Sequence, residues 1–305
     1  MAAMAAGSDW STRGLDEALR RRLEQELSGS ELTSVLLALA EARAAARRPA
    51  DLLAQWQRDR FVAPCPVDAR TLRRVELALF DAAAGFEAVE LSPLAPLGSC
   101  SVLAPVSQKR VVGTLRSTEV VADPTNVLAL LAAERLRRDP QAELRLAAAQ
   151  RCVRAQAVPQ RPGFQAHFAL FCLASAGHER AAHGFVVQAV VEQVGILVDA
   201  LARLMPGRRF TLRLLATPEC EHVAGRIADE LARRDAMPAV RHEALQSPYY
   251  AGLRFMLDAA GEEHERWPLA DGGVFDWLQQ LAANRKLRFV ACGMGTQLIA
   301  SQLAA

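Results

Sequence analysis

The sequence predicts an α+β protein in which helices and short strands share one large core. Apolar residues recur every three or four positions from Leu15 to about Arg48, which is typical of amphipathic helices. Residues 86–91 alternate between apolar and polar, as a half-buried strand does, and the last third of the chain alternates short strands with turns. The chain has 305 residues, of which 51% are hydrophobic, so it can bury a sizeable core.

The first sixty residues are predicted to be helical after a short tail. Residues 1–12 are small and polar, so we expect disorder there. Ser28-Gly29-Ser30 interrupts the first helical pattern, and a further helix is expected over 50–58. The expected organisation is a disordered N-terminus (1–12), a helical extension (13–60) and a core domain (61–305).

The core domain begins with a helix expected over 68–84. Its buried side is predicted to hold Leu72, Val75, Leu77, Leu79 and Phe80. A second amphipathic helix should begin after Asp123 and end near Arg138, because proline is favoured in a first turn and side-chain oxygens can cap the free amides. The other expected elements are strands over 86–91, 111–115, 119–122 and 210–216, helices over 185–205 and 220–234, a closing helix near Thr296, and two apolar stretches within 144–176 around a polar loop at 156–165.

Charge and composition argue against several classes of protein. The chain has 36 basic and 34 acidic residues, so no global field favours nucleic acid. Six cysteines and six histidines show no CxxC, HxxxH or HExxH spacing, so neither a metal site nor a disulfide framework is expected. Gly98-Ser99-Cys100 could present a nucleophile, although no paired base can be identified. Without a leader pattern or an apolar run of about 18 residues, we expect a cytoplasmic protein with no membrane partner.

Three blocks near the C-terminus carry a resemblance to a known family. They read Tyr249-Tyr250-Ala251-Gly252, then Asp271-Gly272-Gly273-Val274-Phe275-Asp276, then Cys292-Gly293-Met294-Gly295-Thr296-Gln297-Leu298. In this order they resemble the histidyl-tRNA synthetase core, with its YYTG strand, its GGGRYD turn and the GxGxER segment that closes the ATP site. The resemblance covers about residue 68 to the end. It implies a class II synthetase fold, an antiparallel sheet of about six strands flanked by helices.

Two further segments are similar to the family's substrate site. The two apolar stretches resemble class II motif 2, where Arg154 would clamp an ATP phosphate and the amino-acid carboxylate. Gln156 lies near the family's glutamate, and Asp123 with Thr125 fits a segment whose glutamate holds the substrate amino group. A surface arginine on a hairpin and an ordinary Asp-Pro-Thr helix start explain the same residues without a ligand. The segment from 68 to Pro93 resembles motif 1, which implies a homodimer, and an ordinary helix-to-strand connection explains the same pattern equally well.

The chain departs from the family at the residues that activate the substrate. Val274 stands in place of the GGGRYD arginine, and Leu298 in place of the arginine that contacts the ATP phosphates. Leu245-Gln246-Ser247-Pro248 replaces a block whose arginine assists adenylate formation, and the positions that read the histidine ring are Leu170 and Ala174. Each lost arginine would cost on the order of several kcal/mol of transition-state stabilisation, so efficient adenylation is not expected. The end of the chain soon after this block predicts no anticodon-binding domain, and tRNA is not an expected partner.

The resemblance favours a non-charging histidyl-tRNA synthetase-like paralogue that binds a small metabolite, an amino acid or a nucleotide, and regulates a protein partner. The regulatory subunit of ATP phosphoribosyltransferase is a relative of that kind. No catalytic residue is assigned, and the cofactor is left unknown. The residues predicted to contact a ligand are Arg116, Asp123, Thr125, Arg154, Gln156, Tyr249, Tyr250, Gly272, Gly273 and Gly295.

The rival hypothesis is an enzyme. A stand-alone class II ligase would activate an unusual carboxylic acid with ATP for transfer to a small molecule or carrier. It would need other cations around the nucleotide, for which Arg116, Arg161 and Arg254 are candidates. A third hypothesis is a structural dimer with an emptied pocket, so the sequence leaves open whether the protein is an enzyme.

Overall fold

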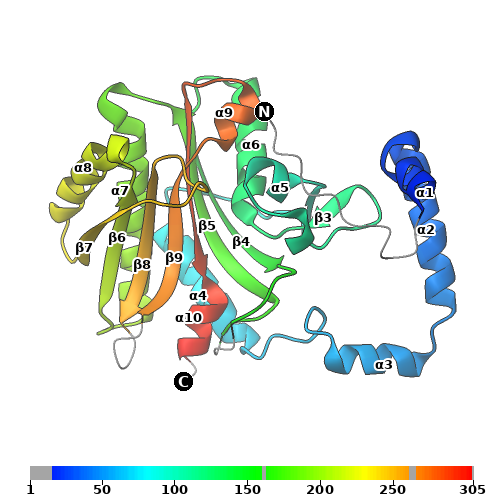
Figure 1. Cartoon of the computed structure of the whole chain (residues 1–305). Coiled ribbons are helices and arrows are strands. Elements are labelled where there is room, and N and C mark those ends of the chain that lie inside the picture. The colour runs from blue at the N-terminus through cyan, green and yellow to red at the C-terminus, as the bar shows by residue number, and fades with distance from the viewer. Residues whose placement is uncertain (1–15, 160–162, 261–265, 304–305) are drawn as a thin grey trace. The chain divides into compact units, whose positions relative to one another are not determined.

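The computed structural model describes residues 16–159, 163–260 and 266–303 (Figure 1). The tail over 1–12 and the candidate cation Arg161 therefore lie outside the described residues. The chain divides into two compact units, which we treat separately. One unit comprises Met1–Asp59 with Gly113–Thr118, and the other comprises Arg60–Val112 with Glu119–Ala305.

The N-terminal unit is helical, as its periodicity predicts. Its described elements are α1 (Glu17–Arg21), η2 (Arg22–Glu26), α2 (Gly29–Ala45) and α3 (Pro49–Arg58). The predicted break falls where Ser28 caps α2, because its hydroxyl accepts the Glu31 amide while the Glu31 carboxylate accepts the Ser28 amide. None of the residues in these four elements is buried, and Leu39, Leu53 and Trp56 are exposed.

The larger unit is built on an eight-stranded sheet with the order β1-β4-β5-β10-β9-β8-β6-β7. The strands are β1 (Glu87–Ala88), β4 (Leu144–Val153), β5 (His167–His178), β6 (Phe210–Ala216), β7 (Ala239–Ala244), β8 (Leu253–Ala260), β9 (Arg266–Phe275) and β10 (Leu287–Gly295). All neighbours from β4 to β6 in this order pair antiparallel, whereas the edge strands β1 and β7 pair in parallel. The six antiparallel strands predicted from the resemblance are thus the centre of the sheet. A separate pair is formed by β2 (Leu94–Pro96) and β3 (Thr118–Val120).

Helices cover both faces of the sheet, which confirms the α+β class (Figure 1). One face packs against α4 (Ala69–Ala82), α7 (Gly184–Leu204), α8 (Glu221–Ala232) and α10 (Thr296–Leu303). The opposite face packs against α5 (Ser99–Leu103), α6 (Pro124–Arg138) and α9 (Trp277–Ala282). Single 3-10 turns are η3 (Gln108–Arg110), η4 (Ala181–His183) and η5 (Pro218–Cys220). The pleat of β10 illustrates the division, since Val290 belongs to the first core and Ala291 to the second.

Helix α7 corrects the expectation that no apolar segment is long enough for a membrane span. Residues 181–204 meet that test by length and composition, but 67% of the most apolar stretch is buried inside the protein. Within it, the Gln193 amide donates to the Ser175 hydroxyl at 3.1 Å and to the Val290 carbonyl at 3.0 Å. A polar side chain bonded to the sheet in this way marks α7 as a central core helix.

Several local predictions were wrong. In α4 the buried residues follow the helical spacing Leu72, Val75, Glu76 and Leu79, which leaves Leu77 61% exposed. The strand expected over 86–91 is reduced to the two residues of β1, and residues 111–115 form no strand.

The C-terminal blocks also differ from the family pattern in their local structure. Asp271 to Phe275 lie inside β9, not in a turn. Tyr249 and Tyr250 lie in the turn before β8, not in a strand. This arrangement turns the two tyrosines towards the face of the sheet that carries α6, where their rings pack on Phe275.

Candidate functional site

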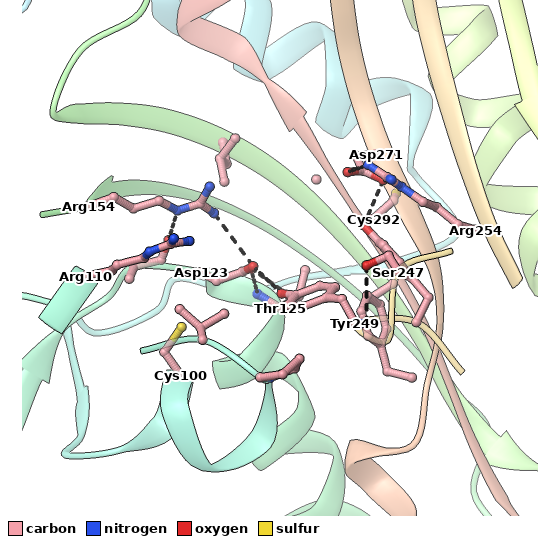
Figure 2. Close-up of a pocket in the computed structure, with 18 of the residues that line it drawn as sticks. Cys100, Arg110, Asp123, Thr125, Arg154, Ser247, Tyr249, Arg254, Asp271 and Cys292 are labelled. Carbon is pink, nitrogen blue, oxygen red and sulfur yellow. Dashed lines mark hydrogen bonds and ion pairs between the residues drawn. The ribbon is translucent and has the colours of Figure 1, made fainter. Parts of the chain in front are cut away.

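A cavity of about 550 Å³ lies on the face of the sheet that carries α6 (Figure 2). The segment 100–111, the start of α6, residues 154–156 just after β4 and the turn 247–250 contribute to its walls, and β5, β8, β9 and β10 contribute the rest. Its polar and thiol-bearing lining residues are Cys100, Arg110, Asp123, Thr125, Arg154, Gln156, Ser247, Tyr249, Tyr250, Arg254, Asp271 and Cys292. A volume of this size suits a small metabolite.

Asp123 is the residue through which several of these side chains are connected. It caps α6, because its Oδ1 accepts the Thr125 amide at 3.0 Å and the Thr125 hydroxyl at 2.6 Å. Its Oδ2 accepts the Tyr249 hydroxyl at 3.0 Å and lies 3.7 Å from Nη2 of Arg154. The cap therefore occupies one carboxylate oxygen, while the other retains acceptor capacity for a ligand.

Arg154 is held just beyond the end of β4 by contacts with three groups. Its Nε donates to the Ala122 carbonyl at 2.8 Å, its guanidinium lies 5.0 Å from the centre of the Phe168 ring, and its Nη2 approaches Asp123. Burial, the largest single effect, acts to lower the pKa of Arg154, but Asp123 and, to a smaller degree, Cys152, Tyr249 and Cys100 act together to raise it, and the pKa is raised overall. The group is a fixed cation whose remaining N–H donors can bind an anion.

A second ion pair lies across the cavity. Arg254 donates from Nε to Oδ1 of Asp271 at 2.9 Å and from Nη2 to Oδ2 at 2.7 Å, and the Tyr250 hydroxyl donates to Oδ1 at 2.8 Å. Burial, reinforced by the neighbouring carboxylates, raises the pKa of both Tyr249 and Tyr250 well above the usual range. Both hydroxyls therefore keep their protons and act as donors to the aspartates.

The predicted glycines Gly272 and Gly273 shape the sheet and do not line the cavity. A Cβ on Gly273 would lie 2.3 Å from the Leu253 carbonyl oxygen and 2.7 Å from Cδ1 of Tyr250. A Cβ on Gly272 would lie 2.3 Å from Cβ of Cys292. Glycine at 273 thus lets the Tyr250 ring lie against β9.

The structure brings six of the ten predicted contact residues into this one cavity. They are Asp123, Thr125, Arg154, Gln156, Tyr249 and Tyr250. Gly295 lines a second cavity, and Arg116 lies on the turn 113–118 of the N-terminal unit and lines neither cavity.

Sequence reasoning missed two charged lining residues, Arg110 and Asp271. In the sequence, Arg110 stands out only as part of the basic pair Lys109-Arg110, and no neighbouring motif indicates that this pair belongs to a binding site. Asp271 was visible as an acidic residue in place of the family's first GGGRYD glycine. Its partner Arg254 was named only as a candidate cation for a ligase.

Val274 and Leu298, two of the places where the resemblance puts an arginine, have different surroundings. Val274 belongs to the core on the α7 side of the sheet, so an arginine in this register would point away from the cavity. Its absence therefore does not decide the chemistry of the cavity. Leu298 lines the second cavity, of about 440 Å³, which shares Arg154, Gln156, Leu170, Arg254, Asp271 and Gly293 with the first. There an apolar side chain stands at the position of the phosphate-binding arginine.

Nucleophilic and metal chemistry find little support in the described part of the chain. Cys100 lines the cavity, but burial, with the charge of Asp123, raises its pKa to about 12, so the thiolate is rare at neutral pH. Among residues 16–159, 163–260 and 266–303, no group of three or more histidine, cysteine or acidic side chains is placed to hold a metal ion.

The architecture is that of the class II aminoacyl-tRNA synthetases, and comparison with solved structures bears this out. The chain is 16% identical to an ATP phosphoribosyltransferase regulatory subunit/histidyl-tRNA synthetase from Bacillus halodurans, with a TM-score of 0.59 over 80% of this chain and 83% of that one. It is 15% identical to a histidine–tRNA ligase subunit from Alicyclobacillus acidocaldarius, with a TM-score of 0.57 over 79% of this chain and 95% of that one. It is 11% identical to histidyl-tRNA synthetase from S. aureus, with a TM-score of 0.55 over 77% of this chain and 66% of that one. No protein-family model and no curated protein matches the chain. At these identities the likeness establishes the fold and leaves function to be argued from the cavity.

Proposed function

We propose that the chain is a non-charging histidyl-tRNA synthetase-like paralogue whose cavity binds a free amino acid. The observation that carries this proposal is the placement of Asp123, Tyr249 and Arg154 in one cavity, with the tyrosine hydroxyl 3.0 Å and the arginine Nη2 3.7 Å from the same carboxylate oxygen. An α-amino acid carries an ammonium and a carboxylate on the same carbon atom, and this group of side chains offers partners for both.

The ammonium group would bind to the Asp123 side of the cavity. Oδ2 of Asp123 keeps one acceptor position, and the Tyr249 oxygen, which donates its proton to Asp123, has lone pairs free to accept. The ligand carboxylate would bind the free N–H groups of Arg154, whose planar fork matches two oxygens. Of the two positions that read the histidine ring in the family, Leu170 lines the cavity and Ala174 does not, and neither offers a hydrogen-bond partner to an imidazole, so histidine itself is disfavoured as the ligand.

Binding without activation is the expected outcome. Class II adenylation depends on positive charge positioned around the triphosphate, and Leu298 and the neutral Leu245–Pro248 segment stand where the family has arginines. We propose that the bound amino acid instead acts as a signal, and that the protein is a soluble cytoplasmic homodimer that regulates a protein partner. The regulatory-subunit name of the B. halodurans structure supports this at the level of fold. The likeness of the segment around α4 to motif 1 favours the dimer.

The alternative is a stand-alone ligase that adenylates an unusual acid. It is favoured by one observation: Arg110 and Arg254 line the cavity and could bind phosphate oxygens. Such an enzyme would exchange pyrophosphate into ATP when its acid is present, whereas the proposed sensor would not.

Thermal denaturation with each of the twenty amino acids, and separately with ATP and magnesium, tests the proposal. A ligand at 100 times its dissociation constant stabilises the folded state by about 2.7 kcal/mol, which is readily measured. We expect stabilisation by an amino acid that is lost in Asp123→Asn, a variant that preserves helix capping. Asp139→Asn, at the opposite end of α6, is the control that should retain it. Stabilisation by ATP alone, with pyrophosphate exchange, would favour the ligase.

A further inference from the structure

The charges that line the cavity do not balance. The lining contains three arginines and two aspartates: Arg110, Arg154, Arg254, Asp123 and Asp271. Two hydrogen bonds pair Arg254 with Asp271, and Arg154 lies beside Asp123. One positive charge, that of Arg110, is left over among the described lining residues.

The main chain fixes Arg110 close to Arg154. Arg110 ends the η3 turn, and its carbonyl accepts the Ala155 amide at 2.8 Å, which ties it to the segment that directly follows Arg154. Figure 2 shows both arginines on one side of the cavity, with Arg254 and Asp271 on the other. Within the described ranges, no hydrogen bond or ion pair engages the Arg110 guanidinium.

A buried carboxylate holds the wall from which Arg110 projects. Glu119 is 1% exposed and accepts the amides of Gly98 at 2.7 Å and Cys100 at 3.0 Å, together with the Gln108 side chain at 2.8 Å. Gln108 is the first residue of the turn that ends at Arg110. The main-chain position of this arginine is therefore fixed by the fold before any ligand binds, while its guanidinium keeps its N–H donors available to a ligand.

We propose that Arg110 is an anion subsite, and that the ligand is an α-amino acid whose side chain carries an anionic group, a carboxylate or a phosphate ester. The inference rests on the proposed amino-acid function of the same cavity. A zwitterion held by Asp123 and Arg154 leaves the charge of Arg110 unpaired, whereas a ligand with one further negative charge neutralises it. A guanidinium presents paired donors that match carboxylate and phosphate oxygens equally well.

Ligand pairs that differ mainly in charge test this directly. Dissociation constants are measured by calorimetry for glutamate against glutamine, aspartate against asparagine, and phosphoserine against serine. We expect the anionic member of at least one pair to bind about two- to fivefold more tightly than its neutral partner, since Arg110 is exposed and solvent weakens the contact. The first two pairs report a carboxylate and the third a phosphate ester.

The variant Arg110→Gln should abolish this preference while neutral amino acids bind as before. Lys109→Gln is the matched control, because it removes one positive charge from the same turn at a residue that does not line the cavity. Equal binding of both members in every pair would overturn the anion subsite but leave the amino-acid site standing. A preference that survives in Arg110→Gln would overturn the role of Arg110. Failure of all amino acids to bind would overturn both proposals.

Discussion

Replacing Glu119 by glutamine should destabilise the larger unit far more than an ordinary charge removal. The carboxylate is buried and accepts three hydrogen bonds, from two main-chain amides and the Gln108 side chain. Glutamine has nearly the same shape, but one of its two terminal groups is a donor. At least one of the three donors must then face another N–H group.

The magnitude follows from the hydrogen bonds that change. A buried donor left without an acceptor costs about 1–3 kcal/mol, and each bond that becomes neutral loses a further ~0.5–1 kcal/mol. With one donor left unpaired and two bonds made neutral, the sum is about 2–5 kcal/mol. At roughly 2–4 °C per kcal/mol for a domain of this size, the melting temperature should fall by roughly 4–20 °C.

Calorimetric melting of Glu119→Gln beside Glu87→Gln is the assay. Glu87 also bonds an arginine, Arg135, but it is 55% exposed, so its loss should cost less than about 1 kcal/mol. Equal effects of the two substitutions would refute the argument that Glu119 holds the cavity wall by buried hydrogen bonds.

Further predictions concern glycines and thiols. Gly273→Ala should destabilise the protein by more than about 2 kcal/mol, because the new Cβ would lie 2.3 Å from a main-chain oxygen. Gly225→Ala, in the middle of α8 with nothing within 4 Å, should stabilise it by about 0.5–1 kcal/mol. Urea unfolding measures both free energies, and the reverse order of stability would contradict the strand register. Burial raises the pKa of Cys100 and of Cys292 to about 12, so a thiol reagent at pH 8 should label the half-exposed Cys65 and Cys220 first. Early labelling of Cys100 or Cys292 would contradict their raised pKa. Because the folded state holds these protons and the unfolded thiols release theirs near pH 8.5, their contribution to stability is complete below about pH 8.5 and declines as the pH rises towards 12. Alanine at both positions should flatten that decline in unfolding free energy, and an unchanged slope would argue against it.

The sequence predicted the fold well wherever one periodic pattern dominated. Helices α6 and α7 and strand β6 lie within a residue or two of their predicted ranges, because amphipathic spacing and capping signals are local. The order of the sheet could not be obtained in that way. The parallel edge strands β1 and β7 depend on contacts with distant segments, and β1 keeps only two of its six predicted residues because only those two pair with β4.

The candidate site was predicted in part for the same reason. Asp123, Arg154 and the two tyrosines were found by their place in a motif order, and they line one cavity. Arg110 was not found, since its importance arises only when the chain returns it to the segment after Arg154. The sequence also could not predict on which face of the sheet Val274 lies, because a shift of one residue in a strand moves a side chain to the other face.

The most direct test of the central claim is a calorimetric titration of the intact protein with the stabilising amino acid, repeated in the presence of ATP and magnesium. We predict one amino acid bound per chain, unaltered by the nucleotide and abolished by Asp123→Asn. Absence of heat with every amino acid, or binding that requires ATP and releases pyrophosphate, would contradict the account.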